Sequence, residues 1–133
     1  MNTKTLFQSI QNGVYIYPLL RNDLELLRTE AITRGFRFYA LNALFILNRT
    51  DLLHAFYEVG ELPDYFGFNW DALEECLLDL SFAPANGYVF AIVHTSYLKD
   101  ILGTDYDVLT DIFSNAGESW QKDGVIFKLL VDQ

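Results

Sequence analysis

An almost unbroken apolar run at residues 88–94, with the sequence YVFAIVH, is the feature that most limits how this chain folds. A strand with water on one face alternates apolar and polar side chains, whereas a strand covered on both faces reads as a continuous hydrophobic run. Strands of that kind occur mainly in parallel sheets that carry helices on both sides. The run therefore predicts a buried strand of an α/β sheet.

Strand-like and helix-like segments alternate around this run. Short β-branched and aromatic segments predict strands at residues 14–17, 36–41, 88–94 and 125–131, with a weaker candidate at 45–47. Polar caps followed by amphipathic spacing predict helices that begin at Asn22 or Asp23, Thr50 or Asp51, Asn69, and Asp100 or Thr104. The order β-α-β-α-α-β-α-β predicts a small three- or four-stranded parallel sheet packed with helices. The pattern leaves open whether residues 14–17 join this sheet and whether residues 2–12 form a short helix.

Length and composition exclude several classes of protein. A chain of 133 residues is the size of one domain, so residues 1–133 are expected to fold as a single unit. The one cysteine, Cys76, cannot form an intramolecular disulfide or a cysteine-rich zinc site. No apolar stretch is long enough to cross a bilayer, and the N-terminus lacks the apolar run of a secretory signal. We therefore expect a cytoplasmic protein that does not bind membranes.

The charge of the chain is unevenly distributed. Residues 1–49 carry a net charge of +3, residues 50–98 carry −8, and residues 99–133 carry −4, which together give −9. The middle stretch has no lysine or arginine, so it cannot neutralise itself locally. Such a field repels nucleic acid and attracts basic partners. The alternative interpretation is an acidic surface that serves only solubility.

Half of the acidic side chains of this stretch lie on one predicted helix, at residues 70–80. Asp71, Glu75 and Asp79 follow one another at spacings of four, and Glu74 lies beside them. Like charges four residues apart destabilise an isolated helix by about 0.2–0.5 kcal/mol per pair. The apolar positions form a separate core stripe of Trp70, Leu73, Cys76, Leu77 and Leu80. A helix selected for stability alone would carry a lysine on its acidic face, so this face predicts a binding function.

Three aromatic residues precede this helix on a predicted loop. Tyr65, Phe66 and Phe68 lie between Pro63 and the helix, around Gly67. Rigid aromatic anchors beside charged groups are typical of protein-binding surfaces. The alternative for Phe66 and Phe68 is that they fold back onto the core, whereas the hydroxyl of Tyr65 favours water.

The segment at residues 62–80 has the sequence LPDYFGFNWDALEECLLDL. It resembles the signature of the barstar family, whose members are intracellular inhibitors of secreted guanyl-specific ribonucleases. The matching positions are Pro63, Asp64, Tyr65, Phe66, Gly67, Asn69, Asp71, Ala72, Leu73, Cys76 and Leu77. The order of elements also fits the family from about residue 36 onward. The resemblance thus implies a barstar-like core at residues 36–133, preceded by a strand–helix extension at residues 1–35.

The resemblance implies a ribonuclease inhibitor that is not an enzyme, uses no cofactor and binds no metal. The helix and its preceding loop would block the active site of a basic ribonuclease by mimicking phosphate. Asp71 would accept hydrogen bonds from the nuclease, Glu75 stands where the family has its dominant aspartate, and Tyr65 would cover a catalytic histidine. The implied partner-binding residues are Tyr65, Phe66, Gly67, Asn69, Asp71, Glu74, Glu75 and Asp79. Asn115 or Glu118 is the nearest candidate for a further acidic contact of the family. We expect a monomer when the protein is free.

Two other classes of function compete with inhibition. Asp71 and Glu75 could act as a general acid and base, or bind a metal together with Asp79, but the sequence predicts no cleft, glycine-rich phosphate loop or defined ligand loop. His54 and His94 have no catalytic motif around them. The second alternative is an immunity or regulatory protein-binding module for a non-ribonuclease toxin or a host protein.

Overall fold

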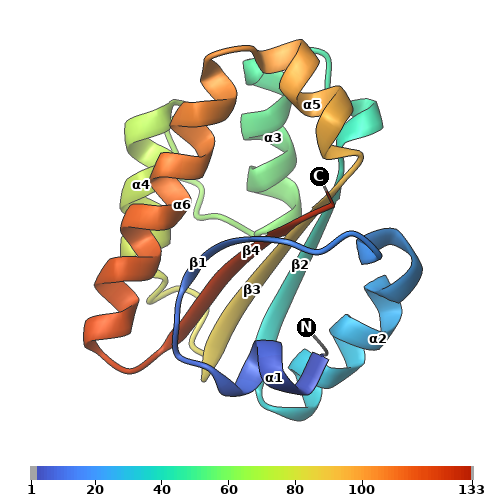
Figure 1. Cartoon of the computed structure of the whole chain (residues 1–133). Helices are drawn as coiled ribbons and strands as arrows, with labels where there is room; N and C mark the ends of the chain where they lie inside the picture. Colours follow the sequence, from blue (N-terminus) through green and yellow to red (C-terminus); the bar gives the residue numbers. More distant parts are fainter. Residues whose placement is uncertain (1–2, 133) are drawn as a thin grey trace.

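A four-stranded parallel sheet forms the centre of the protein, whose computed structural model describes residues 3–132. Its strands are β1 (Gly13–Ile16), β2 (Phe36–Asn42), β3 (Gly87–Val93) and β4 (Ile126–Val131), in the spatial order β1-β4-β3-β2 (Figure 1). All three pairings are parallel, which confirms the predicted α/β class. The first strand does join the sheet, because Gly13 pairs with Lys128 of β4.

The apolar run at residues 88–94 occupies the position that its composition predicts. β3 lies between β2 and β4, and all seven of its residues are buried. Its side chains alternate between two hydrophobic cores on opposite faces of the sheet. Phe90 points into the larger core, where its ring lies 5.1 Å from that of Phe113, while Val89 and Ala91 belong to the smaller core.

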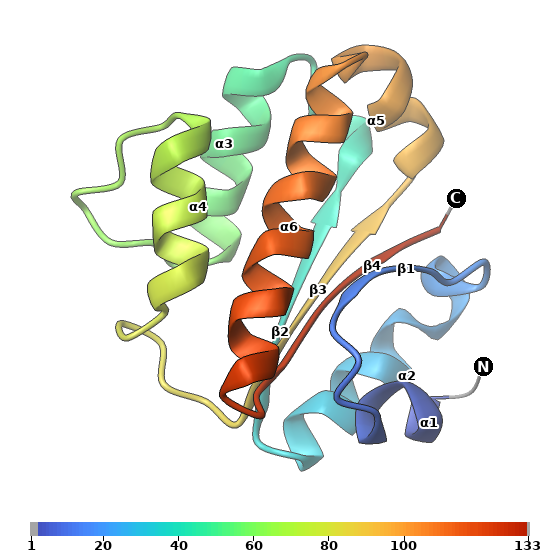
Figure 2. The same cartoon turned by 60° about the vertical axis from the view of Figure 1, so that its left-hand side comes forward.

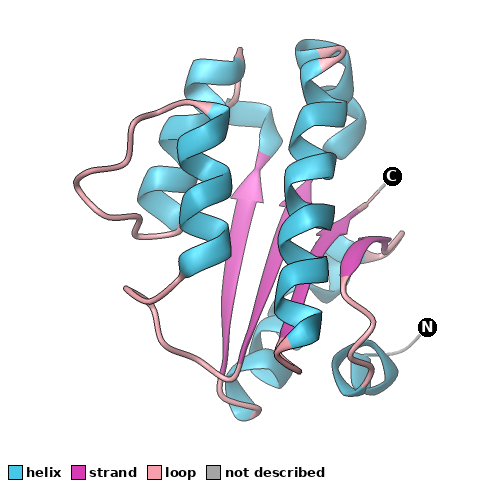
Figure 3. Cartoon of the chain, turned by 90° about the vertical axis from the view of Figure 1, so that its left-hand side faces the viewer, coloured by secondary structure: helices cyan, strands magenta, loops and turns pink. Residues whose placement is uncertain are grey.

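Helices cover both faces of the sheet, as Figure 3 shows from the side. The smaller core lies under α1 (Thr3–Gln8) and α2 (Leu20–Thr33). The larger core lies under α3 (Arg49–Val59), α4 (Trp70–Asp79) and α6 (Asp105–Lys122), and α5 (Thr95–Leu102) lies at the carboxyl end of the strands. None of the helices in the described part of the chain combines the length and apolarity that a membrane span requires.

Two of the predicted helix starts were misplaced. The side chain of Asn48 caps α3 by accepting the backbone N–H of Asp51, so the cap is neither Thr50 nor Asp51. α2 begins at Leu20, before Asn22 and Asp23, and no side chain caps it. Burial of Leu20 in the smaller core compensates for the missing cap. A search of the sequence for polar capping residues cannot detect a helix start of this kind.

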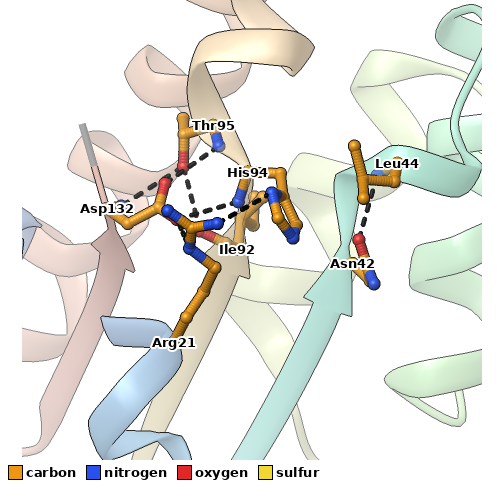
Figure 4. Close-up of polar contacts among 7 residues, drawn as sticks. All are labelled: Arg21, Asn42, Leu44, Ile92, His94, Thr95 and Asp132. Atoms are coloured by element: carbon orange, nitrogen blue, oxygen red, sulfur yellow. Dashed lines mark hydrogen bonds and ion pairs between the residues drawn. The ribbon is translucent and has the colours of Figure 1, made fainter. Parts of the chain in front are cut away.

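The weak strand candidate at residues 45–47 was wrong. The chain leaves β2 through a short 3-10 helix, η1 (Ala43–Phe45), because the Asn42 side chain accepts the backbone N–H of Leu44 at 3.0 Å (Figure 4). This turn ends strand pairing, so no strand forms at residues 45–47, and Phe45 lies 81% exposed.

The sequence also gave no sign of α5. The Asp132 carboxylate, at the end of β4, accepts the backbone N–H groups of His94 and Thr95, each at 2.9 Å (Figure 4). Arg21 lies 3.5 Å from the same carboxylate. Burial would raise the pKa of Asp132, but these hydrogen bonds and Arg21 outweigh it and hold the pKa below its ordinary value. The N-terminus of α5 is therefore capped by a residue that is distant in the sequence but adjacent in space.

Candidate functional site

The acidic helix α4 is held in place by local caps and by its apolar stripe. Asn69 accepts the backbone N–H of Ala72 at 2.8 Å and so caps the first turn, as predicted. Leu80 ends the helix in the left-handed conformation. Leu73, Cys76 and Leu77 are buried in the larger core. α4 lies on the outside of the molecule, beside α3 and α6 (Figure 2). Burial of this stripe fixes the rotation of the helix and leaves its acidic face exposed.

The carboxylates of that face are not neutralised by the protein itself. Asp71, Glu75 and Asp79 are exposed, and Glu74 is half-buried. None of them takes part in an ion pair among residues 3–132. Asp79 accepts a hydrogen bond from the Ser81 hydroxyl at 2.9 Å, within the same short segment. The face therefore presents a concentrated negative charge to solvent.

The three aromatic residues of the preceding loop differ in exposure. Tyr65 is 75% exposed, whereas Phe66 is only 4% exposed and lies in the larger core. Phe68 is 37% exposed, and its ring centroid lies 4.8 Å from that of Phe66 and 4.4 Å from that of His54 on α3. Of the two alternatives left open for Phe66, the structure selects core packing. Tyr65 is the most exposed of the three aromatic side chains of the loop.

Gly67 and Asn69 are both exposed, and of the two Asn69 has the clearer structural role. A side chain on Gly67 would meet only ordinary van der Waals contacts, the nearest being 3.5 Å from Asn69. Phe68, not Gly67, has the positive φ of 53° that turns the chain into α4. The Asn69 amide donates to the Gly67 carbonyl at 3.4 Å while its oxygen caps the helix. Asn69 therefore fixes the turn from the loop into the first turn of α4.

A cavity of about 250 Å³ opens between the loop and the acidic face. It is lined by Tyr65, Phe66, Ala72, Glu75, Cys76 and Asp79. Aromatic, methyl and thiol groups form its apolar part, and the two carboxylates supply its charge. A side chain with an aliphatic stem and a cationic end matches this combination. The sequence placed Cys76 on the core stripe but gave no sign that it reaches a cavity.

The thiol of Cys76 is suited to packing rather than to catalysis. It is buried, and burial raises its pKa, with smaller contributions from the charges of Asp79 and Glu75. A raised pKa keeps a thiol protonated, and the protonated thiol is a poor nucleophile. Cys76 is thus a small apolar group of the larger core, as its position on the helix predicts.

Helix α6 lies beside α4 and supports it. The indole N–H of Trp120 donates to the Leu77 carbonyl at 2.8 Å. Asn115 is exposed, and its amide lies 3.5 Å from a carboxylate oxygen of Glu74. Glu118 is exposed on the same helix. Of the two candidates for a further contact on α6, Asn115 is therefore the one that the structure brings into contact with an α4 carboxylate.

The geometry gives little support to metal binding or to histidine catalysis. The described residues contain no group of three or more acidic, histidine or cysteine side chains placed to hold a metal ion. The ring of His94 lies 3.4 Å from the Arg21 guanidinium, and the residue precedes α5 in the left-handed conformation (Figure 4). His54 lies against Phe68. The contact was not predicted from the sequence, because it joins the middle of α3 to the loop before α4 through tertiary packing.

Comparison with known proteins identifies a family. The family model described as Barstar (barnase inhibitor) matches residues 36–132. No curated protein matches the chain significantly. A solved structure of the ORC2 protein of Aeropyrum pernix, in complexes with ADPNP and ADP, superposes with a TM-score of 0.57 at 16% identity. The match covers 90% of this chain and 34% of the ORC2 chain, so this chain spans about a third of that protein, and the likeness is one of fold alone.

Proposed function

Because the chain belongs to the barstar family, we propose that it is a protein inhibitor of a basic ribonuclease. The observation that carries this proposal is the row of exposed carboxylates Asp71, Glu75 and Asp79 on α4, none of which pairs with a described cation of the protein. A helix that keeps three like charges at spacings of four loses stability. A cationic partner surface would offset that loss.

The mechanism that we propose is occlusion by electrostatic mimicry. The α4 carboxylates occupy the positions that RNA phosphates take in the nuclease, and Tyr65 packs over the catalytic group beside them. The cavity between them receives a lysine or arginine side chain, whose stem meets Phe66 and Ala72 and whose charge meets Glu75. The negative field of residues 50–98 accelerates the encounter with a basic protein. Such an inhibitor acts in the cytoplasm, as a monomer when free.

A second candidate is an immunity or regulatory module for a non-ribonuclease toxin or a host protein. Departures from the family pattern favour a changed target. Glu75 is one methylene longer than the aspartate usual there, and Glu74 replaces an aromatic contact residue. Phe66 lacks the hydroxyl of a tyrosine, and its ring is buried. These differences change the target surface but leave the acidic, protein-binding character of α4 intact.

The proposal is tested by charge removal on α4 with a matched control. Asp71→Ala and Glu75→Ala should each weaken binding to the cognate nuclease by at least ~2 kcal/mol, the threshold that marks a hot-spot residue. Glu25→Ala removes one exposed carboxylate from α2, on the opposite face of the sheet, and should leave affinity within about twofold. Titration calorimetry gives the affinities, and urea unfolding shows that each variant is folded.

Co-purification of the protein with its native partner would identify the target. A ribonuclease whose activity is lost on binding supports inhibition. Recovery of a different toxin, with the same dependence on Asp71 and Glu75, would support the second candidate. Unchanged affinity in both α4 variants would remove this face from the interface and with it both proposals.

A further inference from the structure

The outer edge of β2 carries no strand among the described residues. β2 pairs with β3 over all seven residues of Phe36–Asn42, and the sheet ends there. In an edge strand, alternate residues direct their backbone N–H and C=O groups away from the one neighbouring strand. This edge therefore offers a row of hydrogen-bonding groups to an extended chain.

The β2 edge lacks the usual protection. Natural edge strands are shortened, bent, or furnished with proline and lysine, which prevents pairing with other chains. β1, at the opposite edge, is only four residues long and is followed closely by Pro18. β2 is longer, has the sequence FRFYALN, and carries a single charge at Arg37. Of the two edges, β2 is the one suited to strand addition.

A groove of about 360 Å³ lies along the carboxyl half of this edge, between β2, η1 and α3. It is lined by Ala40, Leu41, Asn42, Phe45, Ile46, Asp51, His54, Ala55, Glu58 and Val59. Phe45, on its rim, is the most exposed large apolar side chain among the described residues. An added strand can thus place alternate side chains in the groove while its backbone pairs with β2.

The charge of the groove selects its occupant. Asp51 and Glu58 line it, and neither forms an ion pair with a described lysine or arginine. They belong to the stretch of residues 50–98 that has no lysine or arginine. A second copy of this chain, with its net charge of −9, is repelled by such a groove. A basic segment is attracted to it.

The β2 groove also meets the loop that precedes α4. His54 lines the groove, and its ring lies 4.4 Å from that of Phe68. Phe68 in turn lies 4.8 Å from Phe66, which lines the cavity beside α4. The two surfaces are therefore neighbours, joined through these three rings.

We propose that the edge of β2 and its groove bind an extended, basic segment of a protein partner, which adds a fifth strand to the sheet. Main-chain hydrogen bonds hold the segment in register, and its Lys or Arg side chains face Asp51 and Glu58. This docking surface lies outside the acidic face of α4, and its test does not depend on inhibition of any nuclease.

The test uses a peptide of about eight residues that alternates valine with lysine or arginine, blocked at both ends. Two isomers carry N-methyl groups at alternate residues, on one edge or on the other. Strand addition predicts that one isomer loses at least about tenfold in affinity, because its hydrogen bonds to β2 are lost, while the other binds like the parent. Fluorescence anisotropy measures affinity. Amide exchange measured by NMR should show that the peptide protects amides of β2.

Charge variants locate the site on the protein. Glu58→Gln should weaken peptide binding about two- to fivefold, whereas Glu25→Gln, on the other face of the sheet, should leave it unchanged. Asp71→Ala and Glu75→Ala should also leave peptide binding unchanged. These two variants therefore distinguish this docking surface from the proposed inhibitory face.

Three outcomes would overturn the proposal. The first is equal binding of both N-methylated isomers, which would indicate attraction by charge alone. The second is peptide binding that is lost in the α4 variants and retained in Glu58→Gln. The third is protection of β2 amides that rises with protein concentration in the absence of peptide, because that result would assign the edge to a second copy of the chain.

Discussion

Trp120 of α6 donates its indole N–H to the main-chain carbonyl of Leu77 on α4, across 2.8 Å. That carbonyl belongs to the last turn of α4, where the helix itself supplies no hydrogen-bond donor. The ring of Trp120 also packs at 5.6 Å from that of Tyr88 at the start of β3. One side chain therefore anchors the acidic helix to both its neighbouring helix and the sheet.

Replacing Trp120 with phenylalanine should destabilise the protein by about 1–3 kcal/mol, because the Leu77 carbonyl loses its donor in a partly buried place. The free energy of unfolding, measured with urea, gives the size of the effect. Tyr65→Phe is a suitable control, since it removes a polar group from an exposed aromatic side chain and should cost less than about 0.5 kcal/mol. Equal effects of the two changes would mean that the hydrogen bond contributes nothing.

Asn12 joins the N-terminal segment to the part of the chain that the family model covers. Its amide donates to the carbonyls of Gly117 and Val125, at 3.0 and 2.8 Å. Its oxygen accepts the backbone N–H of Phe127 at 2.8 Å. One half-buried side chain thus satisfies three backbone groups of α6, β4 and the turn between them.

Asn12→Asp should destabilise the protein by about 2–4 kcal/mol, more than Asn12→Ala, since it replaces the donating amide nitrogen with a carboxylate oxygen that faces two carbonyls. Asn22→Asp is the matched control. It makes the same change at an exposed position in the first turn of α2, where negative charge is favourable. Chemical unfolding should show a large loss for the first variant and at most about 0.5 kcal/mol for the control. Similar small effects would indicate that residues 3–12 are not coupled to the rest of the fold.

Charge reversal at the two ends of α4 should change stability in opposite directions. Asp79→Lys removes the repulsion from Glu75 and places a cation at the helix C-terminus, so it should stabilise the protein by about 0.5 kcal/mol. Asp71→Lys places the same charge at the N-terminus and should destabilise it by a similar amount. Thermal unfolding at low salt measures both. Changes of the same sign would show that contacts other than helix electrostatics govern these positions.

Both reversals should nevertheless weaken binding to a basic partner. Such a pairing of higher stability with lower affinity in Asp79→Lys would indicate that this carboxylate is retained for recognition. If Asp79→Lys instead bound the partner as well as the unchanged protein does, Asp79 would lie outside the interface.

Elements whose determinants are local could be predicted from sequence. α4 is the clearest case, because Asn69 caps it and Leu73 and Leu77 define its buried face within ten residues of chain. The buried strand β3 follows equally from its own composition. The carboxylates of α4 and the exposure of Tyr65 follow from these elements.

Features that depend on distant parts of the chain could not be predicted. α5 takes its cap from Asp132, which lies 37 residues beyond Thr95. The cavity beside α4 exists because Phe66 folds inward while Tyr65 does not, and the sequence left open whether Phe66 packs onto the core. Such contacts arise from tertiary packing, and their signals are not present in any short window of sequence.

Lys128 is a buried cation at the centre of the fold. It lies on β4, is 1% exposed, and donates from Nζ to the Leu6 carbonyl of α1 at 2.6 Å. Its ammonium also lies 4.9 Å from the centre of the Tyr15 ring. Burial lowers its pKa from 10.5 to about 8. The charged form of Lys128 is therefore less favourable in the folded chain than in the unfolded chain.

The protein should become more stable as the pH rises from 8 to 10. In that range the unfolded chain, whose lysine keeps its ordinary pKa, binds more protons than the folded one, so the free energy of unfolding increases with pH. The difference between the two pKa values of Lys128, 10.5 and about 8, corresponds to roughly 3 kcal/mol in the free energy of unfolding. Above pH 10 the trend should reverse, because burial raises the pKa of Tyr39 and of Tyr106 to about 12. The free energy of unfolding of Lys128→Met, measured with urea, should not rise with pH. That of Lys122→Met, a change at an exposed site, should rise as in the unchanged protein. A rise that persists in Lys128→Met would assign it to another group.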